Sequence, residues 1–558
     1  MSIPHGGSGA LTRAPGGPLR RANVSFAATW AGESAFMVVL SVVAFREGGP
    51  GAVGVVTAVR MAMAALLTPF LATVADRVRR ERVLTGIGVV RAVALGTAAA
   101  VTATDGPVLV TYVAAVVATA ALALFRPAHS ALLPALAKSP GELTRANAVR
   151  GMLDSLSTLG GPVVAGVVLS IGDAAVAFAL CAALSLLGGL VVLALPYDPP
   201  PRGLPVRRSP GRDVAQGFVA IAGDRHLSLI TGLGTVQTFT RGCLTVFTVV
   251  VAIHLLDLGD PGVAVLNGAI GAGGVIGSIG AFALLRRGGL GTWFGVGIAL
   301  FGAPLVLVGA LSTTVSAVVL LGLVGAGNAL IDVCGFTLLA RLTDEKVLAR
   351  MFAGFEAILT LGVAVGGLAA PLVVDALGPR GGLVAVGLLA PAVVLATLPA
   401  QRRLDAEMQV RDADVAVLRT VPMLRTLPAA TIGQLGDGLQ HAELAPSAVV
   451  FEQGDEGDRF YVVESGIAEV LQQGRVINTL GPGDGFGEVA LLRETSRTAT
   501  VRAGPGEPLR VAALERSRFL TAVTGYPSSA AAADEVVSEV RKRDVSRAEH
   551  PENDVSGG

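Results

Sequence analysis

Residues 486–501, which read FGEVALLRETSRTATV, contain the side chains best suited to bind a ligand. Gly487 lets another group approach the backbone closely, and residues 488–492 can form one helical turn whose free amide hydrogens point at an anion. Arg497 offers a phosphate a planar, two-pronged donor, a charge-assisted contact worth about 1.5–3 kcal/mol. The carboxylate of Glu488 can accept hydrogen bonds from sugar hydroxyls. Together these residues predict a binding site for a sugar phosphate.

This stretch resembles the phosphate-binding cassette of cyclic nucleotide-binding domains, in which Phe-Gly-Glu and a small apolar run precede a loop, an Arg and an Ala. The matching residues are Phe486, Gly487, Glu488, Ala490, Leu491, Arg497 and Ala499. The resemblance implies that Glu488 binds the ribose 2'-hydroxyl and that Arg497 binds the cyclic phosphate. The implied binding residues are Gly487, Glu488, Val489, Ala490, Arg497, Thr498 and Ala499. A cassette that keeps the fold without the ligand is the alternative, and the presence of both charged residues favours binding.

The choice between cAMP and cGMP depends on Thr498, which follows Arg497 directly. Its hydroxyl group lies beside the phosphate site and can also reach the amino group of a guanine in the syn conformation. Similar Arg-Thr-Ala sequences occur in family members that prefer cGMP and in others that bind cAMP. We expect cAMP as the regulatory ligand, with cGMP as the alternative, and no other cofactor.

Over 415–545, the residues around the cassette resemble the jelly roll and flanking helices of cyclic nucleotide-binding domains. Residues 450–463 read as two strands around a turn rich in Gly and Asp, and another strand follows Ser465 and Gly466. This pattern is similar to the core of the cyclic nucleotide-binding family. The expected helices are 415–428 and 431–439 before the strands, and 515–524 and 529–545 after them.

The composition of the whole chain is that of a polytopic membrane protein. Of its 558 residues, 52% are hydrophobic and 15% are charged, and 72 are glycine. The formal net charge is +1 and the basic residues form short clusters, which argues against a nucleic-acid partner. The three cysteines, Cys181, Cys243 and Cys334, lie far apart without metal-ligand spacing. We therefore expect no metal site, and no motif points to an enzyme.

Residues 24–399 divide into about twelve apolar segments, each long enough to cross a bilayer as a helix. The expected spans are 24–45, 52–75, 84–103, 107–125, 148–171, 174–196, 227–256, 262–284, 292–311, 315–340, 351–375 and 380–399. The first 23 residues lack the apolar core and cleavage site of a signal peptide. The expected organisation is a tail (1–23), a six-helix half (24–198), a central loop (199–225), a second half (226–400), a linker (401–414), the nucleotide domain (415–545) and a polar tail (546–558).

Basic residues fall in alternate loops, around 77–82, 138–145, 202–212, 286–287 and 341–350. The opposite loops carry mainly acidic residues, with Arg46 and Arg380 as exceptions. Because loops rich in Lys and Arg stay on the cytoplasmic side, both termini and the nucleotide domain are expected in the cytoplasm, and the helices in the cell membrane.

The span count, the long central loop and the two halves resemble the major facilitator superfamily. Residues 72–82, ATVADRVRRER, resemble the cytoplasmic loop that latches the gate of that superfamily. Asp76, Arg77 and Arg80 match its motif, whereas Ala72 and Arg79 replace two glycines. A basic loop without a gating role is the alternative.

Two further stretches favour proton-coupled export. Gly161, Pro162 and Gly166 resemble the core of the antiporter motif of the superfamily. Residues 125–134, followed by Asn147, resemble the branch of bacterial drug and siderophore exporters. Ordinary helix packing by small residues and an ordinary proline kink are the alternative interpretation.

Charged residues within the expected spans indicate the transport path, because each costs at least about 2.5 kcal/mol at mid-membrane. They are Glu33, Arg60, Arg91, Asp154, Arg241, Asp332 and Glu356. Glu33 and Asp154 are candidate proton-exchanging carboxylates. Candidates to hold counter-ions or an anionic substrate are Arg60, Arg91 and Arg241. Static ion pairing is the alternative.

We therefore expect an all-α membrane bundle followed by a cytoplasmic β jelly roll: a transporter that exports a small molecule against protons and responds to a cyclic nucleotide. The alternative is a membrane-anchored receptor whose transporter fold no longer moves a substrate. A cyclic nucleotide-gated channel is disfavoured, because the sequence contains neither a repeated-arginine voltage sensor nor a TVGYG filter. The short linker 401–414 would place the sensor directly under the gate.

Overall fold

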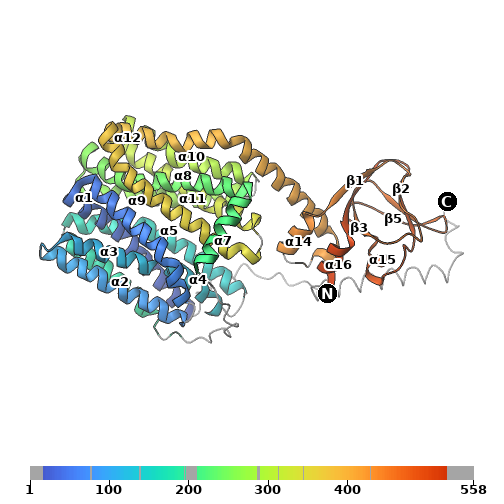
Figure 1. Cartoon of the computed structure of the whole chain (residues 1–558), viewed down its shortest axis with the longest axis horizontal. Coiled ribbons are helices and arrows are strands. Elements are labelled where there is room, and N and C mark those ends of the chain that lie inside the picture. Colours follow the sequence, from blue (N-terminus) through green and yellow to red (C-terminus); the bar gives the residue numbers. More distant parts are fainter. Residues whose placement is uncertain are drawn as a thin grey trace, which may run out of the picture. The chain divides into compact units, whose positions relative to one another are not determined.

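The computed structural model describes residues 17–75, 78–136, 140–171, 173–193, 195, 210–285, 289–311, 313–343, 345–425, 427 and 429–524. The chain divides into two compact units, residues 1–404 and 405–558. Helices form the first unit, and the strands all belong to the second (Figure 1). The predicted fold class, a helical membrane bundle followed by a β domain, is confirmed.

Ten helices in the described part of the chain are long and apolar enough to cross a membrane. Two of them bend at glycine: α1 at Gly48 and Gly49, and α12 at Gly378. Each of these two helices contains two of the predicted spans, so every predicted span overlaps a helix. With the shorter helices included, the described helices up to residue 420 are α1 (Gly17–Ala75), α2 (Arg80–Ala103), α3 (Val108–Leu122), α4 (Phe125–Leu136), α5 (Pro140–Ile171), α6 (Ala174–Val191), α7 (Pro210–Gly223), α8 (Arg225–Val250), α9 (Gly259–Leu285), α10 (Leu290–Leu311), α11 (Thr314–Leu342) and α12 (Glu345–Thr420), with a short π-helix (Val251–Leu255) after α8.

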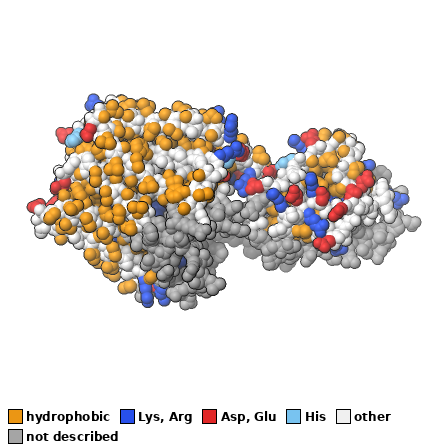
Figure 2. Space-filling model, viewed as in Figure 1, with side chains coloured by type: hydrophobic (Ala, Val, Ile, Leu, Met, Phe, Trp, Pro, Cys, Tyr) orange, Lys and Arg blue, Asp and Glu red, His pale blue; other side chains and the backbone are white. Residues whose placement is uncertain are grey.

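Hydrophobic side chains cover most of the visible face of the helical unit, whereas charged side chains are scattered over the second unit (Figure 2). Val93, Ile276 and Leu372 are examples of highly exposed apolar side chains in the helical unit, at 65%, 70% and 69%. Such a surface would be unstable in water over so large an area and fits contact with lipid tails.

Two stretches that the sequence analysis treats as connections are helical. Residues 401–414 continue α12, and their Ala, Leu, Glu, Met and Arg are good helix formers despite the high charge. The central loop contains α7. A charged composition is typical of linkers, but it does not exclude a helix when Gly and Pro are absent.

Glycines bring α9 and α11 into backbone contact. A Cβ atom on Gly273 would lie 1.7 Å from the carbonyl oxygen of Gly322, and one on Gly325 would lie 1.9 Å from that of Ile270. No side chain fits at these distances, so the two helices pack through their backbones, as is common between membrane helices.

The second unit begins with the end of α12 and two short helices, α13 (Pro422–Arg425) and α14 (Ala429–Gly436). Eight strands follow in two four-stranded antiparallel sheets, ordered β1-β8-β3-β6 and β2-β7-β4-β5. This is the double-sheet arrangement predicted as a jelly roll. The strands are β1 (Gln440–Leu444), β2 (Val449–Phe451), β3 (Arg459–Ser465), β4 (Ala468–Gln472), β5 (Arg475–Leu480), β6 (Gly485–Phe486), β7 (Thr500–Ala503) and β8 (Leu509–Glu515).

Two apolar cores hold the second unit together. One lies between the sheets and includes Val463, Phe486 and Val511. The other joins the helices to the first sheet through residues such as Leu418 and Phe519. Helix α15 (Glu488–Arg493) lies between β6 and β7 in the chain, and α16 (Arg516–Thr524) is the last described element. The second closing helix, predicted over 529–545, lies outside the described residues.

We expect the substitution Gly273→Ala to destabilise the helical unit. The added methyl group would collide with the backbone of α11, and overpacking of this kind costs about 1–3 kcal/mol. Thermal melting of the detergent-solubilised chain should show a lower transition temperature. Gly280→Ala on the same helix is the matched control, because a Cβ atom there meets nothing within 4 Å. Equal melting of the two variants would contradict the close contact.

Candidate functional site

The guanidinium of Arg497 lies at the centre of the cassette and is almost completely buried, with the residue 3% exposed. Its Nη1 donates to the carbonyl of Gly487 at 2.9 Å, and its Nη2 donates to the carbonyl of Arg459 at 2.8 Å. The side chain therefore ties the loop before β7 to both β3 and the start of α15.

Aromatic side chains support the same guanidinium. Its central carbon lies 4.1 Å from the centre of the Phe451 ring and 5.8 Å from that of Tyr461, so the cation lies against the electron-rich faces of the rings. The nearest carboxylate oxygen, Oδ1 of Asp458, is 3.5 Å from Nη2, and the side chain of Asp458 is 67% exposed. The buried Nε has no hydrogen-bond partner. The positive charge is thus fixed in place but only weakly neutralised.

Burial lowers the pKa of Arg497 from its usual range, while Tyr461, Asp458 and Glu488 act in the opposite direction. An arginine pKa begins so high that the group stays charged under physiological conditions. The site therefore presents a positive charge with unused donors, which is what binding an anion requires.

Glu488 is the first residue of α15 and is 7% exposed. Its Oε2 is buried without a hydrogen-bond partner. Burial raises the pKa of this carboxyl group, and its own backbone hydrogen bond and Arg497 lower it. Leaving such an acceptor unsatisfied costs about 1–3 kcal/mol, so a hydroxyl donor from a ligand would be stabilised here.

The rest of the cassette is placed by the turn between β2 and β3. The amide of Arg497 donates to the carbonyl of Asp455 at 2.8 Å, and the amide of Gly454 donates to the carbonyl of Arg497 at 3.0 Å. A Cβ atom on Gly457 would lie 2.7 Å from that of Ala490, so this turn presses on α15. Ala490 is buried, Val489 and Ala499 are partly buried, and Thr498 is exposed. The predicted cassette residues thus surround Arg497, but its contacts with Phe451 and Arg459 were not predicted.

In the helical unit, three of the seven predicted membrane charges meet. Nη2 of Arg91 lies 2.8 Å from Oε2 of Glu33, and Nη2 of Arg60 lies 3.5 Å from Oε1 of the same carboxylate. Arg60 also donates to Thr119, and Arg91 to the carbonyl of Ala118. Two buried cations therefore hold one carboxylate.

The other four predicted charges gather in a second cluster. Nη2 of Arg126 in α4 lies 3.0 Å from Oδ1 of Asp154 in α5. Asp332 interacts electrostatically with both of these residues. It also interacts with two charged side chains of its own half, Arg241 and Glu356. The cluster therefore joins α4 and α5 to α8, α11 and α12, and three of its members, Arg241, Asp332 and Glu356, are exposed.

The second cluster has two features that the sequence analysis missed. Arg126 lies 4.2 Å from the ring centre of Trp30, although its position at the end of a predicted span gave no sign of this contact. Asp332 accepts a hydrogen bond from Asn328, which in turn accepts one from Gln237. Exposed charges on membrane helices require water or a polar partner, so this cluster fits the lining of an aqueous cavity.

The structure describes the antiporter-like motif but only part of the predicted gate motif. Gly161 packs against α1, where an added Cβ would lie 2.5 Å from that of Ser34, and Gly166 packs equally closely against Ala264 of α9. Pro162 lies within α5. For the predicted gate loop, Arg80 begins α2, whereas Asp76 and Arg77 lie outside the described residues.

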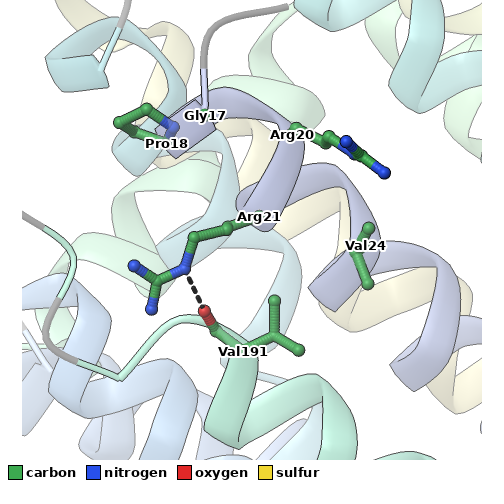
Figure 3. A pocket seen from close by; sticks show the side chains of 6 residues that line it. All are labelled: Gly17, Pro18, Arg20, Arg21, Val24 and Val191. Atoms are coloured by element: carbon green, nitrogen blue, oxygen red, sulfur yellow. Dashed lines mark hydrogen bonds between the residues drawn. The ribbon is translucent and has the colours of Figure 1, made fainter.

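A cavity of about 470 Å³ opens beside the first turns of α1 (Figure 3). One of its lining residues, Arg21, donates from Nε to the carbonyl of Val191 at 2.8 Å. This bond caps the end of α6, where carbonyl groups lack helical partners. The cavity contains none of the predicted site residues.

Comparison with known proteins separates the two units. Residues 23–321 match the Major Facilitator Superfamily, and residues 441–526 match the cyclic nucleotide-binding domain. A crystal structure of the nucleoside transporter NupG shares the fold over 69% of this chain and 99% of that one, with a TM-score of 0.59 and 13% identity.

Regulatory subunits of cAMP-dependent protein kinase are similar to the second unit. That of Yarrowia lipolytica is 42% identical over 118 residues, which are 21% of this chain and 31% of that protein. That of Schizosaccharomyces pombe is 43% identical over 89 residues, 16% and 22% of the two chains. The chain therefore spans less than a third of the length of these curated relatives.

We expect Gly487→Ala to destabilise the second unit more than Gly474→Ala does. Both glycines have left-handed backbones, with φ of 88° and 78°, so each alanine costs roughly 1–2 kcal/mol. Only at Gly487 would the methyl group also meet Nη1 of Arg497, at 2.6 Å, whereas at Gly474 it meets nothing within 4 Å. Calorimetric melting of the full chain should show that Gly487→Ala lowers the free energy of unfolding of the second unit more than Gly474→Ala does, by at least about 1 kcal/mol. Indistinguishable losses would mean that Arg497 is not held as described.

Proposed function

Since the chain belongs to the major facilitator superfamily and carries a cyclic nucleotide-binding domain, we propose that it is a secondary transporter regulated by a cyclic nucleotide. The observation that carries this proposal is the pairing of two unsatisfied groups in the cassette. Nε of Arg497 and Oε2 of Glu488 are both buried without partners, one a donor and the other an acceptor. A cyclic phosphate beside a ribose hydroxyl supplies the complement to both.

In this proposal the cyclic phosphate binds Arg497 and the ribose 2'-hydroxyl donates to Glu488. The backbone amides near Ala490 and Ala499 complete the contact. We favour cAMP, because the similar proteins are named as regulatory subunits of a cAMP-dependent kinase. The exposed hydroxyl of Thr498 is free to reach a syn guanine, which keeps cGMP as the second candidate.

The transported substrate is proposed to pass the cluster of Arg126, Asp154, Arg241, Asp332 and Glu356, because both halves contribute to it. Movement of one half against the other would then change the distances between the charged side chains of the cluster. We propose export of a small molecule in exchange for protons across the cell membrane, with both termini in the cytoplasm.

Asp154 is the better candidate for the proton carrier. Its side chain is 37% exposed and pairs with the exposed Arg126, whereas the carboxylate of Glu33 is held by two buried arginines. Protonating Glu33 would leave two buried cations without a counter-charge, which is strongly unfavourable. Glu33, first considered as a second proton carrier, is therefore assigned a structural role together with Arg60 and Arg91.

We expect Arg497→Ala to weaken cyclic nucleotide binding about 10-fold to 100-fold, because a charge-assisted contact worth about 1.5–3 kcal/mol is lost. Isothermal calorimetry on the full chain with cAMP and cGMP measures the affinity. The same variant should lose the change in flux that nucleotide causes in inside-out vesicles.

The control is Arg493→Ala, at the exposed end of α15, which should keep both the affinity and the response. Binding without any flux in the wild type would favour the alternative of a membrane-anchored receptor. Absence of binding by the wild type would remove the regulatory proposal altogether.

We expect Asp154→Asn to abolish proton-driven flux while the protein still folds and inserts, because an amide keeps the shape but cannot carry a proton. Proteoliposomes with an imposed pH gradient give the measurement. Asp105→Asn, at an exposed turn, is the matched control and should transport normally. Glu33→Gln should instead lower the melting temperature, because breaking a buried ion pair costs about 3–5 kcal/mol. Full proton-driven flux in Asp154→Asn would overturn this assignment.

A further inference from the structure

His441 on β1 lies between two carboxylates from different elements. Its Nδ1 is 2.8 Å from Oε1 of Glu464 on β3, and its Nε2 is 3.2 Å from Oδ1 of Asp414 on α12. The imidazole therefore connects the end of α12 to the first sheet of the second unit. Its side chain is 45% exposed, so protons can reach it from water.

The hydrogen bonds of this arrangement require one proton more than a neutral imidazole carries. An ionised carboxylate only accepts hydrogen bonds, and a neutral imidazole has one N–H donor and one bare nitrogen. With a carboxylate at each nitrogen, a neutral ring would place one lone pair against another. Both contacts are satisfied only when the ring holds two protons or one carboxyl group is protonated.

The surrounding charges make the extra proton favourable. Asp437, after α14, also acts on Asp414 and is paired with Arg411 of α12 at 3.0 Å. Burial raises the pKa of Asp414, and the negative charges of Glu464 and Asp437 raise it further, while His441 lowers it.

On β1 itself, the nearest ion pair two residues along joins Glu443 to Arg510 of β8 at 3.1 Å. The residue of β8 directly opposite His441 is Ala512, which carries no charge.

The segment of α12 that this contact holds is also anchored by apolar packing. Leu418 is fully buried in the core between the helices and the first sheet, with Val415 packed against it. Thr420 donates from Oγ1 to the carbonyl of Gly483. Residues 405–420 of this helix, which include Asp414, belong to the second unit.

We propose that His441 is a proton-dependent clasp that holds residues 411–420 of α12 against β1 and β3. The clasp is complete when the triad of His441, Asp414 and Glu464 holds the extra proton. It loses one of its two carboxylate contacts when a rise in pH removes that proton. The clasp does not depend on nucleotide.

Amide hydrogen exchange of the full chain without nucleotide tests the proposal, with protection factors corrected for the intrinsic effect of pH. In the wild type we expect protection of residues 411–420 to fall about threefold to tenfold between pH 5.5 and 8.5. In Asp414→Asn we expect no such fall, because the amide can donate to the bare nitrogen of a neutral imidazole.

Glu443→Gln, two residues along the same strand, is the matched control and should keep the pH dependence of the wild type. Glu464→Gln offers the same test from the other side of the ring if Asp414→Asn does not fold. A flat pH profile in the wild type would overturn the clasp. So would an unchanged fall in both amide variants.

Discussion

Burying the charge of Arg497 is the constraint on which the ligand-binding half of the second unit depends. A guanidinium removed from water must have its donors satisfied, or the fold loses several kcal/mol. Two backbone carbonyls and two aromatic rings meet most of this need without neutralising the charge, and Nε is left without a partner. Because these carbonyl groups and rings come from different segments, the segments must meet at Arg497. They are the turn after β2, the start of β3 and the start of α15. It also leaves the electrostatic capacity for an anion in place.

The helical unit meets the same constraint in two different ways. Around Glu33 the charges are paired inside a single half and shielded from solvent, as expected of a permanent part of the fold. Around Asp154 and Asp332 the charges come from both halves and remain partly exposed. A cluster that bridges two bodies is stable only in the arrangement that brings them together, so its energy changes when they move. In the proposed transport cycle, the cluster around Glu33 would stay intact while the cluster that joins the two halves changes.

Local sequence predicted the features that depend on neighbouring residues. The helical turn of α15, the glycine before it and the strands around the Gly/Asp turn follow from short-range propensities. The contact of Arg497 with Phe451 could not be predicted, because it depends on how β2 and β7 pair across the sheet. The seven membrane charges were found individually, but their division into two clusters depends on helix packing. The charge of residues 401–414 predicts a linker but does not show that the linker is helical, which follows from their helix propensities.

Helix α12 runs from Pro379 to Thr420 without a further break and so passes from the first unit into the second. Residues 405–420 of this helix belong to the second unit, where Arg411 pairs with Asp437 and Asp414 contacts His441. A fragment that begins at residue 415 would therefore lack both of these contacts. The second unit produced alone must begin before Arg411 to keep them.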